Sequence, residues 1–423
     1  MSITKKIDNQ LIISVLEKIG SEVKLFIMDD GSLYDLSKYL RHLPNVQILI
    51  LSNMRYEKLP ELEEFSLEHL KTLEMSFCDY RITKLLKAFP ENVLKKLSIK
   101  GAIHPIENFI MTQRNIKILY ITSEDFDLIH LKDLKLEAFD TDVIDSLEEF
   151  LKHQPKLREV TLSSLSITDR YFHFVTQLQL VFILKINVES ISSGALCEIA
   201  SLKKLKVLEI INFDKEEYEG HITELSQITN LQVAFLTIQF PYQEIPSSDM
   251  VRIGENFKCI NSIDITAKNV TDEHIRPFIT KVISVTVQNW LDLMHDDFYG
   301  GFNHFNMNIQ NCNLKVLNIR GMKLQFEDLP RLVQNFPNLI YTALKFDGYV
   351  RDEHIEQLVV GMPDLRCIMT SQCCRLTIKI ADILKQYGKN FEEIHLLGVE
   401  DFNKAQFDEA LRSHPRDIIF IQK

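Results

Sequence analysis

The chain has 423 residues, of which 45% are hydrophobic and 25% are charged, and its formal net charge is −11. This composition is typical of a globular protein and excludes disordered, collagen-like and membrane-spanning chains. Nucleic-acid backbones and anionic membrane surfaces are bound by clustered Lys and Arg, so the acidic balance predicts neither as the main partner. The length exceeds the roughly 250–300 residues of a single compact core and indicates several domains or a repetitive architecture.

The first 22 residues predict one amphipathic helix that caps the apolar end of the next part of the chain. Their apolar stretch is short, contains Glu17 and Lys18 and lacks a cleavage site, so it does not read as a signal peptide. The seven cysteines are an odd number and sparse for the length. That usage is typical of a reducing compartment and predicts a cytoplasmic or nuclear protein.

From Val23 onward, the pattern L-x-x-L-x-L recurs about every 25 residues, with Ile, Val, Met or Phe allowed at the apolar places. Each copy predicts one short strand whose fourth and sixth places point into a core, because side chains alternate between the two faces of a strand. Leu317 and Ile319 are one such pair. Including a worn copy near Asp417, about 16 or 17 copies begin at Val23, Val46, Leu70, Leu94, Ile116, Leu131, Leu157, Val181, Leu205, Leu231, Ile260, Val282, Leu314, Leu339, Leu365 and Phe391.

Between the strands the apolar residues are spaced by three and four, which predicts helices on the opposite, convex side. The clearest cases are residues 32–41, 145–152, 327–334 and 380–387. Several helices begin at residues whose side-chain oxygens can cap free N–H groups, namely Ser32, Thr168, Asp169, Thr271, Asp272 and Asp352.

The pattern resembles leucine-rich repeat proteins, and more narrowly their ribonuclease-inhibitor-like and cysteine-containing classes. The helix starts Ser-Ile-Thr-Asp (166–169), Asn-Val-Thr-Asp-Glu-His-Ile (269–275) and Tyr-Val-Arg-Asp-Glu-His-Ile (349–355) are similar to the I-T-D start of the cysteine-containing class. The resemblance implies an α/β fold: a right-handed solenoid, or horseshoe, over residues 23–423, with a parallel concave sheet and convex helices.

The same subclass is similar to the substrate-recognition region of F-box and leucine-rich-repeat proteins, which are receptors of cullin–RING ubiquitin ligases. An F-box needs about 40 to 50 residues before the repeats, and the chain has 22 before Val23. Contact with a ligase adaptor would therefore require a missing or separate F-box.

Catalytic signatures such as G-x-S-x-G, the P-loop, G-x-G-x-x-G, H-E-x-x-H and C-x-x-C do not occur. Two Asp-Glu-His triplets, at 272–274 and 352–354, could hold a metal or an acid/base pair. Their matching places in two repeats favour helix capping instead. We therefore predict no catalytic residue, no metal and no cofactor.

Residues 290–313 form the longest insertion, and they are rich in aromatic residues and potential metal ligands. The insertion is predicted either to pack its aromatic side chains on the solenoid or to act as a partner-binding loop, with a metal site the weakest alternative. The candidate anchors of such a loop are Trp290, Phe298, Tyr299, Phe302 and Phe305.

The third, fifth and seventh places of each strand point away from the core and are predicted to form the concave binding face. Val207, Ile211, Val233 and Phe235, and a second group that includes Tyr341 and Cys367, make two parts of it unusually apolar. The candidate partner-binding residues on this face are Lys96, Lys100, Tyr120, Lys135, Glu159, Lys185, Glu209, Phe235, Tyr341, Met369 and His395.

The sequence thus predicts a non-catalytic protein–protein interaction module that binds a protein partner on the concave face. The resemblance favours a substrate receptor related to F-box ubiquitin-ligase subunits. A stand-alone scaffold or inhibitor, as in ribonuclease-inhibitor-like proteins, is the alternative, and a GTPase-activating leucine-rich repeat protein is a third.

Overall fold

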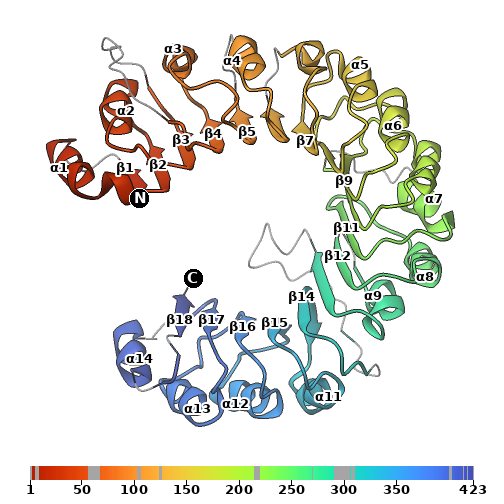
Figure 1. Ribbon diagram of the computed structural model, residues 1–423. Helices are drawn as coiled ribbons and strands as arrows, with labels where there is room; N and C mark the ends of the chain where they lie inside the picture. Colours follow the sequence, from red (N-terminus) through yellow and green to blue (C-terminus); the bar gives the residue numbers. More distant parts are fainter. Residues whose placement is uncertain are drawn as a thin grey trace. The chain divides into compact units, whose positions relative to one another are not determined.

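The computed structural model describes residues 2–4, 9–55, 67–101, 106–122, 126–213, 220–268, 270–289, 305, 310–399, 403–412, 414–416 and 418–422. The chain divides into two compact units, Met1–Ile191 and Ser192–Lys423. In both units parallel strands alternate with helices (Figure 1), which is the leucine-rich repeat solenoid architecture that the repeat pattern predicts. Among the described residues, no helix is long and apolar enough to cross a membrane.

In the first unit each strand pairs in parallel with the next one along the chain. Its strands are β1 (Ser2–Thr4), β2 (Leu25–Asp29), β3 (Ile48–Ser52), β4 (Thr72–Ser76), β5 (Lys96–Lys100), β6 (Ile118–Thr122), β7 (Ala138–Thr141), β8 (Glu159–Leu162) and β9 (Ile183–Asn187). Its helices are α1 (Asn9–Ile19), η1 (Gly20–Glu22), α2 (Leu33–Leu40), α3 (Ile82–Leu86), α4 (Glu107–Thr112), η2 (Leu128–Leu131), α5 (Leu147–Lys152) and α6 (Asp169–Thr176).

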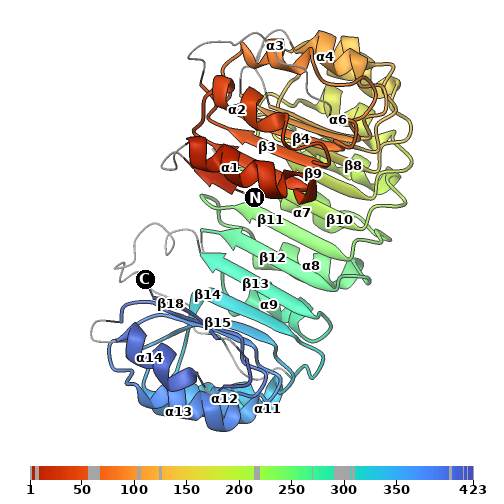
Figure 2. The same ribbon diagram turned by 60° about the vertical axis from the view of Figure 1, so that its left-hand side comes forward.

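The second unit repeats this order, and its strands lie side by side in Figure 2. Its strands are β10 (Val207–Ile211), β11 (Phe235–Phe240), β12 (Ser262–Ala267), β13 (Ser284–Asn289), β14 (Val316–Leu324), β15 (Tyr341–Phe346), β16 (Cys367–Thr370), β17 (Glu393–Leu396) and β18 (Ile419–Gln422). Its helices are η3 (Ser193–Ser201), α7 (His221–Gln227), α8 (Ser247–Asn256), α9 (Asp272–Ile279), η4 (Phe326–Asp328), α11 (Leu329–Asn335), α12 (Asp352–Gly361), α13 (Lys379–Tyr387) and α14 (Lys404–Leu411).

The core lies between the strands and the helices of each unit. Leu317 and Ile319, at the fourth and sixth places of their strand, are fully buried, as the pattern predicts. The third, fifth and seventh places are on the opposite side of the sheet, which we call the open face. Along strands such as β3 and β4, buried residues at the fourth and sixth places alternate with solvent-accessible residues at the other places, so the open face of these strands is accessible to solvent.

Two repeat starts differ from the prediction. Leu131 and Leu134 belong to η2 and a turn, and β7 begins at Ala138, so this copy starts at Leu136. The true sixth place is polar: Thr141 is fully buried, and its Oγ1 accepts the N–H of Val143 at 2.9 Å. The spacing of apolar residues in the preceding segment matched the repeat pattern, so the prediction placed the strand too early in the chain.

The second difference is at Leu231. Leu236 of β11 pairs with the core residue Leu208 of β10, so the copy begins at Val233. Val233 is therefore a fully buried first place and not part of the open face.

The N-terminal segment contains more than the single predicted helix. β1 pairs with β2, and only then does α1 begin, burying Ile12 and Leu16 four residues apart. The hydroxyl of Tyr39 on α2 donates to Oδ1 of Asn9 at 2.7 Å and ties α1 to the next repeat.

Asparagines three residues before the strands connect successive repeats. In the first unit the side-chain amides of Asn45 and Asn115 donate to the carbonyls of Ser21 and Asn92 at 2.8 and 2.7 Å. In the second unit Asn338 does the same to Cys312 at 2.8 Å. These bonds satisfy turn carbonyls that no strand partner reaches.

Candidate interaction site

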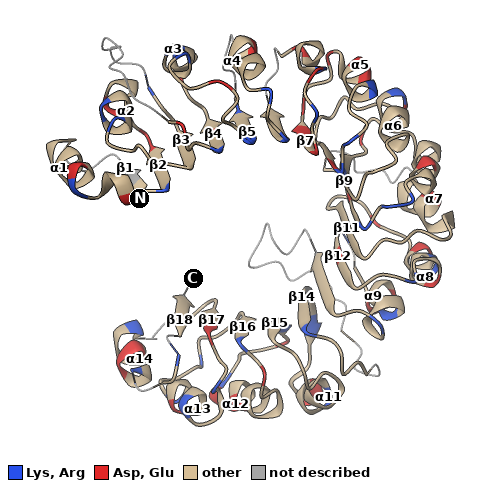
Figure 3. Ribbon diagram, in the orientation of Figure 1, with Lys and Arg blue, Asp and Glu red and all other residues tan. Residues whose placement is uncertain are grey.

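Charged residues of both signs lie along the strands of each unit (Figure 3). In the first unit the structure places the candidates Lys96, Lys100, Tyr120, Glu159 and Lys185 on the open faces of β5, β6, β8 and β9. In the second it places Glu209, Phe235, Tyr341, Met369 and His395 on β10, β11, β15, β16 and β17.

Lys135 does not belong to the open face. It is an exposed residue of the segment before β7, because the register of that repeat begins five residues later than predicted. The open-face positions of β7 are Ala138 and Asp140.

Five residues of the first unit form two neighbouring groups at β4 to β6, Glu74 with Lys96 and Tyr120, and Phe77 with Lys100, which we together call the β4–β6 patch. Lys96 Nζ pairs with Glu74 Oε1 at 2.7 Å and lies 5.2 Å from the centre of the Tyr120 ring. Lys100 Nζ lies 5.6 Å from the centre of the Phe77 ring. Both lysines thus contact an aromatic ring, which favours a cation over its face. The patch presents two aromatic rings, each of which lies beside a lysine ammonium.

Phe77 is unusual because its backbone has φ 51° and its side chain is 61% exposed. The residues after β2, β3 and β5 share this left-handed conformation, and they are Asp30, Asn53 and Gly101, types that tolerate it. In each case the backbone N–H donates to the residue that ends the next strand; that of Phe77 reaches the Lys100 carbonyl at 2.8 Å. The turn therefore imposes the conformation, and Phe is the residue that suits it least.

Sequence reasoning missed Phe77 because its place follows the strand and no pattern of apolar residues marks it. The signal that could have found it is the residue type, since Asp, Asn and Gly occupy the same place in the neighbouring repeats.

Asp140 is a second residue that the wrong register concealed. It lies between Tyr120 of β6 and Thr161 of β8 on the open face. Burial raises the pKa of its carboxyl to about 6, the charges of Glu159 and Asp142 add to the rise, and the Lys185 ammonium opposes it. Burial, together with the acidic groups Glu159 and Asp140, also raises the pKa of the Tyr120 hydroxyl. A cationic group on a partner would therefore interact favourably with this part of the open face.

The apolar part of the second unit is smaller than predicted. Phe235 is 51% exposed and is paired with half-buried Val207 across the β10–β11 ladder, whereas Val233 is buried.

Of the predicted loop anchors, Trp290, Phe298, Tyr299 and Phe302 lie outside the described residues. Phe305 is 2% exposed, and its N–H donates to the carbonyl of Lys323 at 3.2 Å. Its ring is therefore a core residue beside β14 and is not free for a partner, which corrects its assignment as a binding residue.

The Asp-Glu-His triplets lie at helix starts, as predicted, but Asp272 and Asp352 are the first helical residues and not the caps. The histidines bond to the residue that precedes each helix. His274 Nδ1 accepts the N–H of Thr271 at 3.1 Å, and its Nε2 lies 2.7 Å from the carbonyl of Ile245. His354 Nδ1 accepts the N–H of Arg351 at 3.1 Å. A histidine at the third helical position therefore replaces the Glu or Gln of the usual capping box.

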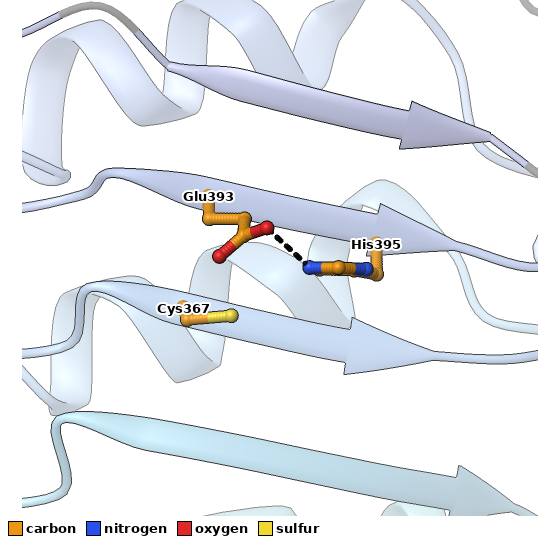
Figure 4. Close-up of side chains that lie close together, drawn as sticks. All are labelled: Cys367, Glu393 and His395. Atoms are coloured by element: carbon orange, nitrogen blue, oxygen red, sulfur yellow. Dashed lines mark ion pairs between the residues drawn. The ribbon is translucent and has the colours of Figure 1, made fainter. Parts of the chain in front are cut away.

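One group of potential metal ligands occurs in the part of the chain that the structure describes: Cys367, Glu393 and His395 (Figure 4). The three residues come from the open faces of β16 and β17, and one ligand atom of each lies within 4.8 Å of the others. His395 Nε2 and Glu393 Oε1 are 2.7 Å apart. Sequence reasoning placed each residue on this face but did not compare neighbouring strands, where the register brings them together.

No protein family matches the chain, and no curated protein matches it. Among solved structures, it is similar to a chain of the Rad7 and Elc1 complex in yeast, with a TM-score of 0.48 and 13% sequence identity, over 98% of this chain and 93% of that chain. It is also similar to a chain of the TLR13–ssRNA13 complex, with a TM-score of 0.47 and 13% identity, over 94% of this chain and 67% of that chain. At these values neither similarity carries an argument about a partner or an activity.

Proposed function

We propose that the chain is a non-catalytic protein-binding module and that the β4–β6 patch of its first unit holds the partner. The observation that carries the proposal is Phe77. Its large apolar ring is exposed to solvent, and its backbone adopts a left-handed conformation that is unfavourable for a Phe residue. Strain of this kind, of order 1–3 kcal/mol, persists where the surrounding structure imposes it and clusters at ligand-binding sites.

The neighbours of Phe77 fit the same role. Exposed aromatic rings flanked by cations are typical of the anchors that dominate the binding energy of protein interfaces. The Glu74–Lys96 pair and the cation–ring contacts restrict these side chains before binding, which reduces the conformational entropy lost when a partner docks. Mixed charge around an aromatic anchor suits a protein surface better than a phosphate backbone.

The test compares Phe77→Gly with Asn53→Gly in affinity capture from cells. Both changes place glycine at the same left-handed turn position of adjacent repeats, so their effects on the backbone match. We expect the wild type and Asn53→Gly to retain one stoichiometric partner, and Phe77→Gly to weaken its capture about 30-fold, the loss expected for a hot-spot residue.

Undiminished capture by Phe77→Gly, or equal loss by both variants, would contradict the proposal. Phe235→Glu tests the exposed apolar residue of the second unit in the same assay: loss of the partner in that variant alone would move the site to β10–β11.

The finer proposal is that the module selects substrates for ubiquitin ligation. Its support is the resemblance of the helix starts at Thr168 and Thr271 to the cysteine-containing repeats of F-box receptors. We expect cullin–RING adaptor subunits to co-purify with the endogenous protein. We also expect the ubiquitination of the partner to fall in cells that carry Phe77→Gly. A partner whose own activity is blocked, with no ligase subunit present, would instead support a stand-alone scaffold or inhibitor.

A further inference from the structure

The group Cys367, Glu393 and His395 offers three donor atoms of the types that zinc takes, a thiol sulfur, a carboxylate oxygen and an imidazole nitrogen. We propose that these residues bind a divalent zinc ion on the open face of the second unit.

The scaffold that presents the donors is rigid. Cys367 pairs with Glu393, and Met369 pairs with His395, in a parallel ladder whose strands are about 4.8 Å apart. Side chains at paired positions of one face therefore start at a separation that an ion can bridge. Ligand sites built on strands hold their geometry better than sites built on loops.

The distances require only small side-chain movements. Zinc–ligand bonds of about 2.0–2.3 Å in a tetrahedral arrangement place donor atoms about 3.3–3.8 Å from one another. The three donors now lie within 4.8 Å of one another. Glu393 Oε1 and His395 Nε2, at 2.7 Å, must separate by about 0.6–0.8 Å to admit the ion.

The arrangement fits a metal better than a nucleophilic cysteine. An activated thiol lies in an electropositive setting beside a base, whereas Cys367 is buried next to the Glu393 carboxylate, and His395 Nε2 is directed at Glu393 and not at the sulfur (Figure 4). A dication between the sulfur and the carboxylate attracts both the Glu393 carboxylate and the thiolate that forms on binding. When the ion binds, the Cys367 sulfur gives up its proton to solvent, so proton release accompanies loading.

The site is also accessible. Glu393 and His395 have side-chain exposures of 35% and 17%, so the ion can enter from the open face. Three protein ligands leave one position of a tetrahedral zinc open to water or to a donor from a partner.

Cobalt(II) is the probe, because it replaces zinc and its thiolate complexes absorb in the near ultraviolet. We expect chelator-treated, full-length protein to bind one equivalent of cobalt with a thiolate band, and equimolar zinc to abolish that band. Cys367→Ser should lose the band. Loss of a residue that only supports a metal ligand weakens metal binding by ~10- to 100-fold. Because Glu393 and His395 are proposed as ligands, Glu393→Gln and His395→Ala should weaken cobalt binding by at least this factor.

Matched controls lie in the same elements. Cys374→Ser removes the half-buried free thiol that follows β16, and Met369→Leu changes the neighbour of His395 in the ladder; both should bind cobalt as the wild type does. Hydrogen exchange provides a second readout, with zinc slowing exchange in peptides from β16 and β17 only when Cys367 is present. Unchanged binding by Cys367→Ser, loss of the band in Cys374→Ser, or no cobalt band in the wild type would each overturn the proposal.

Discussion

Replacing Asp140 by Asn should stabilise the first unit at neutral pH and leave it unchanged in acid. Asn has the shape of the neutral carboxyl but cannot ionise. Because folding raises the pKa of Asp140 from 3.8 to about 6, the native state holds this proton more tightly than the unfolded chain does. Ionisation of Asp140 therefore costs stability as the pH rises from about 4 to above 6.

The magnitude follows from the two pKa values. A difference of about two pH units corresponds to at most ~3 kcal/mol at 1.36 kcal/mol per unit. Asp140 is only half-buried, so solvent screening reduces this to about 1–2 kcal/mol. The gain in Asp140→Asn should be complete at pH 8, fall to roughly a third near pH 4.5, and vanish well below the unfolded pKa.

Hydrogen exchange of peptides from β7 and β8, measured across a urea series at each pH, gives the local free energy of unfolding. Local measurement is needed because a repeat chain of this length need not unfold in one step. Lys185→Gln serves as the companion variant: it removes the cation that lowers the Asp140 pKa, so Asp140→Asn should stabilise that background more. A destabilising or pH-independent effect of Asp140→Asn would refute the reasoning.

Two further predictions concern the second unit. The ring of His354 stacks on Phe326 with the ring centres 3.8 Å apart, and burial lowers the pKa of His354. As the pH falls, the unfolded chain is therefore protonated before the folded one. The helix α12 should lose protection from hydrogen exchange below about pH 6.5. His354→Gln keeps an acceptor for the Arg351 N–H and should remove most of this acid sensitivity; protection factors in α12 that fall equally in both proteins would contradict the capping role. Leu317→Asp places an unpaired charge at a fully buried site and should destabilise β13 to β15 by at least ~4 kcal/mol, measured by exchange and chemical unfolding. Thr286→Asp, at a half-buried open-face position of β13, should have a much smaller effect.

The repeat pattern predicted the fold because it records a physical requirement. Every strand must bury its fourth and sixth side chains, and residues such as Leu317 and Ile319 can do so in one register only. The helices between the strands follow in the same way from apolar spacing of three and four, and α2, α5, α11 and α13 fall within the predicted segments or overlap them.

The prediction was wrong where local spacing and tertiary packing disagreed. Leu131 and Leu134 satisfy the pattern but lie in η2 and a turn, whereas Thr141 breaks the pattern and is a buried strand residue. The position of the strand is decided by its ladder pairing with β6 and by the hydrogen bond from the Val143 N–H to Thr141. The periodicity of apolar residues contains no information on either.

The sequence by itself therefore determined the architecture and, outside the repeats of β7 and β11, which residues face away from the core, because alternation along a strand is a local property. Only the tertiary structure decided which of those residues meet. Cys367 and His395 become neighbours through strand register, Lys100 reaches the Phe77 ring from the adjacent strand, and Phe77 takes its left-handed conformation from a hydrogen bond to the next repeat. Contacts between repeats depend on relative register and turn geometry, which are fixed when the strands pair.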